Sequence, residues 1–222
     1  MKKNKLLQQL TLKTILIICL FICCIILFSY IADEAVYERE DVFDANIITF
    51  VTSHSTNALI KIMRVFTFFG STKFLLPVYI IIVIYFLIKK KYRYSIAITT
   101  IALGGTALMQ LFKLFFHRKR PELSLIKALK TYSFPSGHAF SSLIFCSILI
   151  YLLWQKNLAP IWKWLSATIL FFFSLMIGIS RIVLEAHFAT DVIAGYCLAI
   201  AWLILSFWVL RNYINSNKKI MV

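Results

Sequence analysis

Charged residues are scarce in this chain. Asp, Glu, Lys and Arg make up only 15% of its 222 residues, whereas 61% are hydrophobic. Soluble domains average about 25% charged and about 45–50% apolar residues, so this composition excludes an ordinary soluble domain. It indicates an integral membrane protein, and the length fits one domain covering residues 1–222.

Acidic residues are scarcer still. Nine Asp and Glu stand against 24 Lys and Arg, which gives a net charge of +15. A basic balance can serve nucleic-acid binding, but here the basic residues lie between apolar runs, which indicates orientation in a membrane instead. We therefore expect the bilayer as a partner and no nucleic acid, and no obligatory protein partner is evident.

Cysteines are few and lie entirely within apolar runs: Cys19, Cys23, Cys24, Cys146 and Cys197. A disulfide framework needs cysteines in aqueous, oxidising parts of a chain, so none is expected here. These residues fit buried small hydrophobes, and no zinc-binding cysteine pattern is present. The cysteines thus indicate no metal site, and no cofactor is expected.

Six apolar runs are long enough, or nearly so, to cross a bilayer as helices, which takes about 20 residues each. They cover residues 14–32, 74–88, 94–116, 139–154, 161–179 and 191–209. The second is short unless residues 67–70 join it. The first could be a signal peptide, but its 14-residue apolar core is long and Tyr30 fits poorly before a cleavage site, so we expect a retained span.

Residues 41–69 carry a weaker, amphipathic pattern. Apolar side chains recur at helical spacing at Phe43, Ile47, Phe50, Val51, Leu59, Met63 and Phe66. Asp44, Lys61 and Arg64 lie off those faces, and the polar run 53–57 argues against a seventh span. We expect one or two interfacial helices between the first and second spans. The predicted fold is therefore all-α and polytopic.

Charge asymmetry orients these spans. With the N-terminus in the cytoplasm, the cytoplasmic tails and loops carry 13 cations and no acids, and the other side carries 11 cations and all nine acids. The positive-inside rule then favours cytoplasmic N- and C-termini in the cell membrane. The difference in cations is small, but several of the outer cations belong to short motifs that could need them for another reason.

Three motifs lie at the outer ends of predicted spans. They are KLFFHRKRP (residues 113–121), PSGH (135–138) and SRIVLEAHFATD (180–191). Three helices therefore bring seven reactive or charged side chains to one membrane face: Lys113, Arg120, Ser136, His138, Arg181, His187 and Asp191.

The cations of these motifs indicate an anionic ligand. Lys113 interrupts an apolar run, where a lipid-facing charge is costly, although it could simply snorkel to the interface. Arg120 follows about two helical turns later and could share its face. Arg181 could be an ordinary boundary arginine, but with the other two it forms a cluster whose planar donors suit phosphate oxygens. Arg118 and Lys119 are expected to meet lipid headgroups.

The PSGH motif fits the start of a helix. The first amides of a helix lack intrahelical partners and bind anions. Gly137 would let a ligand approach the backbone, and Ser136 offers a hydroxyl. Simple capping is the alternative, because Ser and Pro both favour helix starts. Capping does not explain His138.

His187 and Asp191 are spaced four residues apart. On a helix they would share a face, so that the carboxylate fixes the tautomer and leaves the other ring nitrogen as a nucleophile. The alternative is a helix-start Asp with an incidental His. Glu185 is interpreted as a solvated loop acid, and His54 and His117 as surface or interfacial residues.

These residues resemble the type-2 phosphatidic acid phosphatase superfamily, and within it the bacterial phosphatidylglycerophosphatase B-like membrane enzymes. Lys113, Arg120 and Pro121 match Lys-x6-Arg-Pro, residues 135–138 match Pro-Ser-Gly-His, and residues 180–191 match Ser-Arg-x5-His-x3-Asp. All three motifs are complete, and they cover residues 113–191.

The resemblance implies a six-span lipid phosphatase with its site at the outer leaflet and no metal or cofactor. By this analogy His187 attacks phosphorus and forms a phosphohistidine, Asp191 orients it, and His138 protonates the leaving oxygen. The phosphoryl oxygens would be held by Lys113, Arg120, Ser136, Gly137 and Arg181. Implied substrates are phosphatidylglycerophosphate, phosphatidic acid, diacylglycerol pyrophosphate and undecaprenyl pyrophosphate.

Three alternatives stay open on the sequence. A metal-dependent hydrolase could use His138, His187 and Asp191 as ligands, although three neighbouring cations oppose a metal. A lipid-phosphate or anion transporter could use the same cations. Phosphate transfer to a lipid acceptor would need the same residues as hydrolysis. Residues 41–69 and the loop 121–134, with Lys127 and Lys130, could guide substrate entry.

Overall fold

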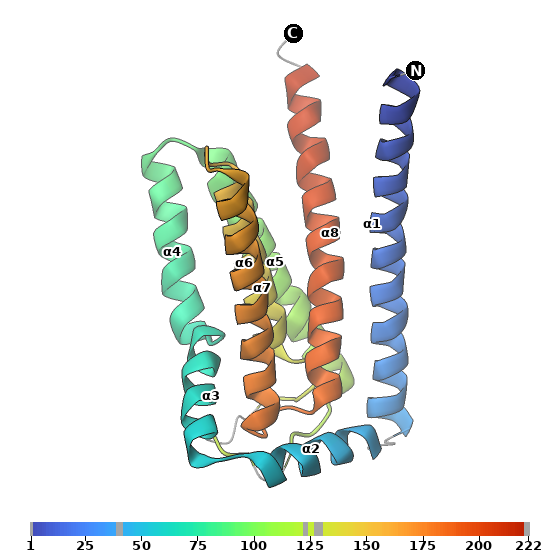
Figure 1. Cartoon of the computed structure of the whole chain (residues 1–222), viewed down its shortest axis with the longest axis vertical. Helices are drawn as coiled ribbons and strands as arrows, with labels where there is room; N and C mark the ends of the chain where they lie inside the picture. Colours follow the sequence, from blue (N-terminus) through green and yellow to red (C-terminus); the bar gives the residue numbers. More distant parts are fainter. Residues whose placement is uncertain (1, 39–41, 122–123, 127–130, 220–222) are drawn as a thin grey trace.

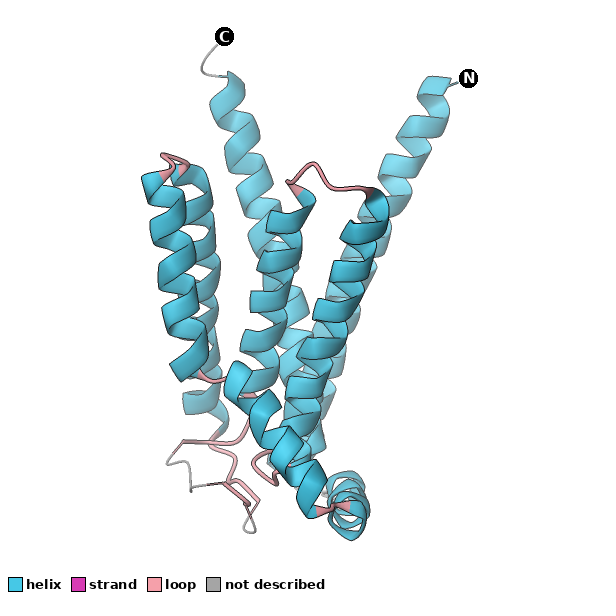
Figure 2. Ribbon diagram, turned by 60° about the vertical axis from the view of Figure 1, so that its left-hand side comes forward, coloured by secondary structure: helices cyan, strands magenta, loops and turns pink. Residues whose placement is uncertain are grey.

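The computed structural model describes residues 2–38, 42–121, 124–126 and 131–219. Within these ranges the regular structure is entirely helical (Figure 2). Six stretches of the described chain are long and apolar enough to cross a membrane. The prediction of an all-α, six-span protein is therefore confirmed. Lys127 and Lys130 lie outside the described residues.

The helices follow one another in an up-and-down order. They are α1 (Lys2–Ala32), a π-helical turn (Asp33–Glu38), α2 (Val42–His54), α3 (Asn57–Phe69), α4 (Thr72–Ile88), α5 (Tyr92–Phe116), α6 (Gly137–Trp154), α7 (Pro160–Val183) and α8 (Ala189–Lys219). Both ends of the chain lie at one end of the bundle, and α2 crosses the other end (Figure 1). Helix α6 packs against α7 and α8, and α1 packs against α8.

Two helices occupy the segment that showed the amphipathic pattern. The first helix, α2, ends shortly before Thr56. The hydroxyl of Thr56 accepts a hydrogen bond from the Leu59 amide at 3.2 Å and so caps α3. Helix α2 lies across the bundle as expected for an interfacial helix, but α3 leads into α4 (Figure 1). Together α3 and α4 form the apolar stretch Asn57–Ile88, so the second span is longer than the predicted residues 74–88.

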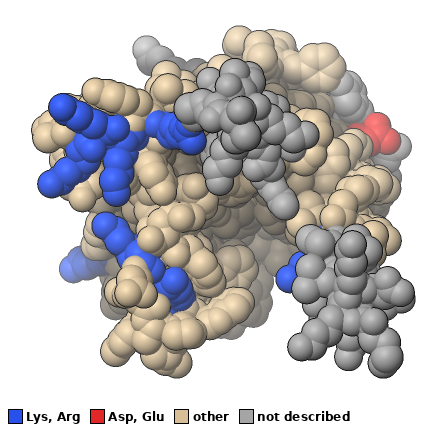
Figure 3. Space-filling model, turned by 90° about the horizontal axis from the view of Figure 1, so that it is seen from above, with Lys and Arg blue, Asp and Glu red and all other residues tan. Residues whose placement is uncertain are grey.

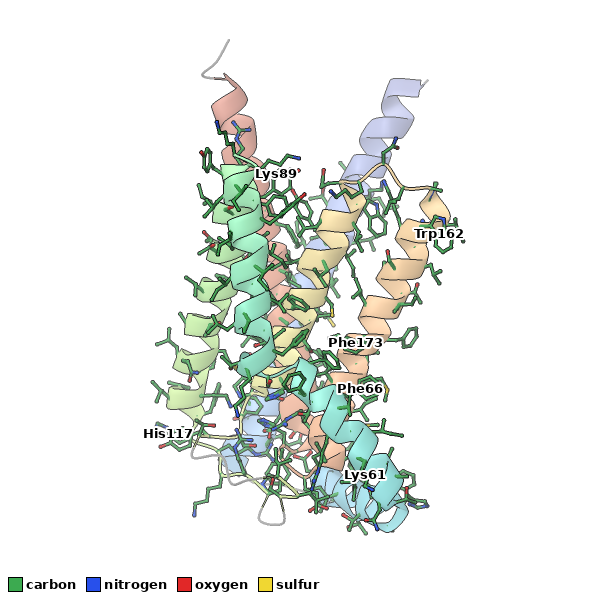
Figure 4. The ribbon with its side chains drawn as sticks, turned by 90° about the vertical axis from the view of Figure 1, so that its left-hand side faces the viewer. Lys61, Phe66, Lys89, His117, Trp162 and Phe173 are labelled. Atoms are coloured by element: carbon green, nitrogen blue, oxygen red, sulfur yellow. The ribbon has the colours of Figure 1, made fainter. Side chains whose placement is uncertain are left out.

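Helix α3 is held against α7 by aromatic contacts. The rings of Phe66 and Phe173 lie 5.7 Å apart between centroids (Figure 4), and Phe69 lies 5.3 Å from the same Phe173 ring. The α3–α4 corner at Gly70 follows directly. These contacts place the end of α3 beside the middle of α7, and Thr67 within hydrogen-bond distance of Arg181 in the last turn of α7.

Exposed lysines gather at the end of the bundle where the chain begins and finishes. Lys89 and Trp162 lie near the end where the chain begins and finishes, whereas Lys61 and His117 lie near the opposite end (Figure 4). Seen from the first end, Lys and Arg side chains gather on one side of the described surface (Figure 3). The short connections there hold Lys89, Lys90, Lys91 and Lys156, all of them exposed.

Candidate active site

The connection after α5 carries the first motif back over the bundle. Helix α5 ends at Phe116 because His117 adopts a left-handed conformation with φ of 51°, and its amide caps the Lys113 carbonyl. The prediction that Arg120 could continue the helical face of Lys113 is therefore wrong. Arg120 instead approaches from the loop.

Lys113 points into the protein, not toward the interface. It is buried, and its Nζ donates to the carbonyl of Tyr132 at 2.7 Å and to that of Ser133 at 3.4 Å. The snorkelling alternative is thus excluded. Because an ammonium group has three N–H donors, one donor has no acceptor among the described residues and is available to a ligand.

Arg120 binds backbone carbonyls of the loop before PSGH and of the segment before His187. Its Nε donates to the Thr131 carbonyl at 2.8 Å, and its Nη1 donates to the Ala186 carbonyl at 2.6 Å. Nη1 also lies 3.1 Å from Nε2 of His187. Arg120 therefore links the segment before PSGH to the segment that carries His187.

The PSGH motif begins α6 as predicted, but without side-chain capping. Ser136 is the N-cap residue, and its Oγ is buried without a hydrogen-bond partner among the described residues. The Ser136 amide donates to the Asp191 carbonyl at 2.9 Å. A Cβ at Gly137 would meet only Cε of Lys113, at 3.8 Å, so the space above this glycine is open. The motif thus offers a free hydroxyl and an accessible backbone.

Arg181 is the most deeply buried cation of the group, with 1% of its surface exposed. Helix α7 continues to Val183, beyond the predicted residue 179, and therefore carries Arg181 inside its last turn. One nitrogen, Nη1, donates to the hydroxyl of Thr67 at the end of α3. Nε and Nη2 are buried without a partner in the described part of the chain. A buried guanidinium with two unused donors is suited to an anion.

His187 and Asp191 meet, although not along one helical face. Helix α8 begins at Ala189, so His187 lies in the preceding loop, and its Nδ1 is 3.3 Å from Oδ2 of Asp191. That oxygen also accepts from the Phe188 amide at 3.0 Å and from the hydroxyl of Ser133. The carboxylate is fully buried and fixed by several donors.

The contacts of His187 define which nitrogen carries the proton. Arg120 can only donate, so Nε2 must accept and the proton lies on Nδ1, facing Asp191. Burial lowers the pKa of His187 to about 3, which keeps the ring neutral. A neutral imidazole with its lone pair on Nε2 is the form required of a nucleophile.

His138 lies half-buried on the first turn of α6, against the α3–α4 corner. A Cβ at Gly70 would come within 3.0 Å of Cδ2 of His138 and 2.5 Å of Cγ2 of Ile177. Gly70 therefore permits the close approach of α3, α6 and α7 at this point. A Cβ at the adjacent Gly137 would lie 3.8 Å from Cε of Lys113. Ile177 lies about one turn before Arg181 on α7. His138 therefore lies close to these two predicted cations.

A model of the PAP2 superfamily matches residues 91–215, more than half of the chain. The chain belongs to the PAP2 superfamily. The matched region contains all eight residues singled out from the sequence, from Lys113 to Asp191. It leaves out α2 and α3.

Known PAP2 proteins resemble the chain in sequence and fold. Phosphatidylglycerophosphatase B of Bacillus subtilis strain 168 is 26% identical over 164 residues, which cover 72% of this chain and 77% of that protein. The transmembrane PAP2 type phosphatidylglycerolphosphate phosphatase structure from Bacillus subtilis matches with a TM-score of 0.74 at 24% identity, over 90% of this chain and 96% of that one.

A second solved structure, that of Aquifex aeolicus LpxE, matches with a TM-score of 0.59 at 24% identity, over 76% of this chain and 96% of that one. At these identities the structural matches establish the fold alone. The six-span fold predicted from the sequence is thus shared with solved membrane proteins.

Three interpretations of charged residues in this PAP2 chain are wrong. Arg118 does not meet lipid headgroups, because it is buried and pairs with Asp44 and Asp191. Asp44 is itself buried, although the amphipathic pattern of α2 placed it on the polar face. Glu185 is also buried and accepts a hydrogen bond from Thr52 at 3.3 Å. In each case α2, folded over the end of the bundle, removes the residue from water.

Four further side chains reach the site although no sequence pattern predicted a role for them there. Ser133 and Arg118 bind Asp191, Thr67 binds Arg181, and Asp44 binds Arg118. Ser133 and Arg118 lie within or beside motifs, which is a usable signal. Asp44 and Thr67 lie in α2 and α3, far away in the chain, and no local pattern marks them.

Proposed function

We propose that this PAP2 protein is a membrane lipid phosphatase that hydrolyses a lipid phosphate or diphosphate monoester through a phosphohistidine. Membership of the family and similarity to a phosphatidylglycerophosphatase support a phosphoric monoester hydrolase. The observation that carries the proposal is Arg181, whose Nε and Nη2 donors are buried without partners among the described residues. With the open space at Gly137 and the Ser136 hydroxyl, which also lacks a partner there, they would form an anion cradle for a phosphoryl group that His187 attacks.

In the first step, Nε2 of His187 attacks phosphorus as the bond to the lipid oxygen breaks. A phosphoryl oxygen would replace Nε2 as the acceptor for Arg120, and Arg181, Lys113, Ser136 and the amides at the start of α6 would bind the others. Phosphoryl transfer depends mainly on such positioning and charge stabilisation. His138 donates the proton that the leaving oxygen needs.

In the second step, His138 takes a proton from water, and the resulting oxygen attacks the phosphohistidine. The N–P bond breaks, inorganic phosphate leaves, and His187 returns to its neutral state. Throughout, Asp191 accepts the hydrogen bond of Nδ1–H and stabilises the positive charge that develops on the ring.

We also propose that the site faces the outside of the cell and that both termini lie in the cytoplasm. Exposed lysines of the short loops lie at the end of the bundle where the chain begins and finishes, and the positive-inside rule favours the cytoplasm for that end. The six acidic residues that the structure describes fall in segments of the opposite end: Asp33, Glu34, Glu38, Asp44, Glu185 and Asp191 (Figure 1). A phosphorylated amphiphile of the outer leaflet would reach the site from the interface.

The direct test of this function is phosphate release by purified protein from a panel of lipid mono- and diphosphates. Phosphatidylglycerophosphate, phosphatidic acid, diacylglycerol pyrophosphate and undecaprenyl pyrophosphate form the panel, with His187→Ala as the control. We expect release from at least one lipid and none from the variant. Full activity of His187→Ala would rule out the mechanism.

The same assay distinguishes the alternatives. Among the residues that the structure describes, no three His, Cys, Asp or Glu side chains are grouped as a metal ion would need. We expect hydrolysis to survive strong chelators, whereas its loss would favour a metal enzyme. Appearance of the phosphate on an added lipid acceptor would identify a phosphotransferase, and movement of intact lipid phosphate across vesicles would identify a transporter.

A further inference from the structure

A chain of three buried charges connects α2 to the carboxylate that faces His187. Nη2 of Arg118 lies 2.8 Å from Oδ2 of Asp44, and Nη1 lies 2.8 Å from Oδ1 of Asp191. Arg118 is 8% exposed, Asp44 1% and Asp191 not at all. Arg118 lies two residues before Arg120 but turns away from the anion cradle, so the proposed reaction assigns it no role.

Arg118 holds the oxygen of Asp191 that does not face His187. Oδ2 accepts hydrogen bonds from His187, from Ser133 and from the Phe188 amide, whereas Oδ1 accepts one from Arg118. Binding both oxygens fixes the rotation of the carboxylate, which in turn fixes the imidazole. The guanidinium also lies 4.2 Å above the centre of the Phe188 ring, and this contact ties Arg118 to the residue that follows His187.

Asp44 anchors this arrangement to α2 and to the start of α8. Its Oδ1 accepts the Thr190 amide at 3.0 Å, and its Oδ2 accepts the Thr190 hydroxyl. The same hydroxyl accepts from Nη1 of Arg118 at 2.8 Å. Asp44, Thr190 and Arg118 thus hydrogen-bond to one another in a closed ring. A lysine in place of Arg118 could not form this ring and also bind Asp191, because it lacks the two separate nitrogens of the guanidinium.

Together, Asp44, Arg118 and Asp191 leave a net negative charge beside His187. Arg118 alone would neutralise Asp191, but Asp44 shares the guanidinium, so the three side chains keep one net negative charge. Burial by itself would lower the pKa of Arg118, but Asp191 and Asp44 raise it above its ordinary value, so the guanidinium stays charged. A negative charge beside His187 stabilises the imidazolium character that phosphoryl transfer creates.

We propose that Arg118 and Asp44 are a positioning pair: they set the orientation and charge of Asp191 and thereby hold Nε2 of His187 toward the anion cradle. The inference rests on the proposed function and deepens it. It also gives α2 a role in the reaction, since Asp44 is the residue through which that helix reaches the site.

The test compares Arg118→Lys and Asp44→Asn in the full-length protein with the lipid that the wild type cleaves. Lysine keeps the charge but cannot bridge two carboxylates, and asparagine keeps the shape of aspartate but not its charge. Lys119→Gln, which changes the exposed neighbouring residue, is the matched control. The readouts are kcat, KM, the rate of phosphoryl transfer to His187, inhibition by inorganic phosphate, and the midpoint of thermal unfolding.

We expect kcat and the phosphoryl-transfer rate to fall about tenfold to a hundredfold in both variants, the range found for outer partners of oriented histidines. KM and the inhibition constant of inorganic phosphate should change less than about twofold, because the cradle itself is intact. The double variant should be no slower than the slower single variant, since the two residues act as one unit. Lys119→Gln should match the wild type.

Wild-type rates in either variant would overturn the inference. So would a loss of kcat that merely parallels losses of phosphate affinity and thermal midpoint, because that pattern denotes a structural tether. If Asp44→Asn does not fold, Asp44→Glu, which keeps the charge but displaces it, replaces it under the same criteria. Failure of the proposed function is separate: it would show as an inactive wild type or an active His187→Ala.

Discussion

Arg181 is the side chain on which phosphate recognition most depends. One edge of its guanidinium is held by Thr67, and the two remaining nitrogens are buried without partners in the described chain. A lysine would keep the charge but present one point donor where two parallel ones are available. The planar fork, and not charge alone, is what this position requires.

We therefore expect Arg181→Lys to lower kcat/KM by about a hundredfold or more, the loss that follows removal of one donor to a transition-state oxyanion. Arg64→Lys is the matched control, because Arg64 is exposed and binds only the Leu125 carbonyl among the contacts seen. Steady-state kinetics with the preferred lipid provide the measurement. Near-equal kcat/KM values for Arg181→Lys and wild type would show that the Arg181 guanidinium does not bind the phosphate.

Two glycines of the site should respond differently to alanine. At Gly70 a methyl group would press on Ile177 and His138, so Gly70→Ala should lower both the thermal midpoint and kcat. At Gly137 the methyl would enter open space beside Lys113, so Gly137→Ala should leave the midpoint unchanged. It should nevertheless weaken inhibition by inorganic phosphate roughly tenfold, or about 1.4 kcal/mol. Unchanged inhibition of Gly137→Ala by inorganic phosphate would mean that no ligand binds above Gly137.

At the level of helices, the contact between α6 and α8 brings the second and third motifs together. A Cβ at Gly195 would lie 2.6 Å from the backbone oxygen of Ser136, which cannot move aside as a side chain could. Gly195 thus allows α8 to approach the start of α6, where the Ser136 amide binds the Asp191 carbonyl.

Gly195→Ala should accordingly destabilise the protein by about 1–3 kcal/mol and lower activity by separating PSGH from His187. The lipid-facing neighbour Ile193, changed to Ala, should have a much smaller effect because it is more than a third exposed. Thermal unfolding in detergent and kcat give the two readouts. A stable and fully active Gly195→Ala protein would show that the close contact is not needed.

The sequence predicted those helices and residues whose signals are local. Long apolar runs determine the spans, and the spacing within each motif identifies Lys113, Ser136 and His187. It did not predict Asp44, because its partner Thr190 is 146 residues away and the local pattern of α2 suggested a solvated acid. Nor did it predict that α3 joins the second span, since an amphipathic helix that packs on α7 looks the same as one that lies on a membrane.

For the molecule as a whole, the proposed orientation in the membrane can be tested at the two ends of the bundle. In a background without the five native cysteines, Lys119→Cys would place a thiol on the exposed loop at the site end, and Lys90→Cys would place one at the other end. A membrane-impermeant thiol reagent added to intact cells should label the first and not the second. Labelling of Lys90→Cys alone would contradict the proposed orientation and show that the end of the bundle with Lys90 faces the outside of the cell.

If phosphate passes through His187, the phosphohistidine can be trapped and located in the chain. Purified protein is mixed with a lipid substrate labelled in its terminal phosphate, stopped within one turnover in alkaline detergent because phosphohistidine is labile in acid, and mapped by peptide. We expect label on the peptide containing His187 in the wild type and none in His187→Ala. Substrate cleavage by the wild type with no label on that peptide, or with label on the His138 peptide instead, would contradict it.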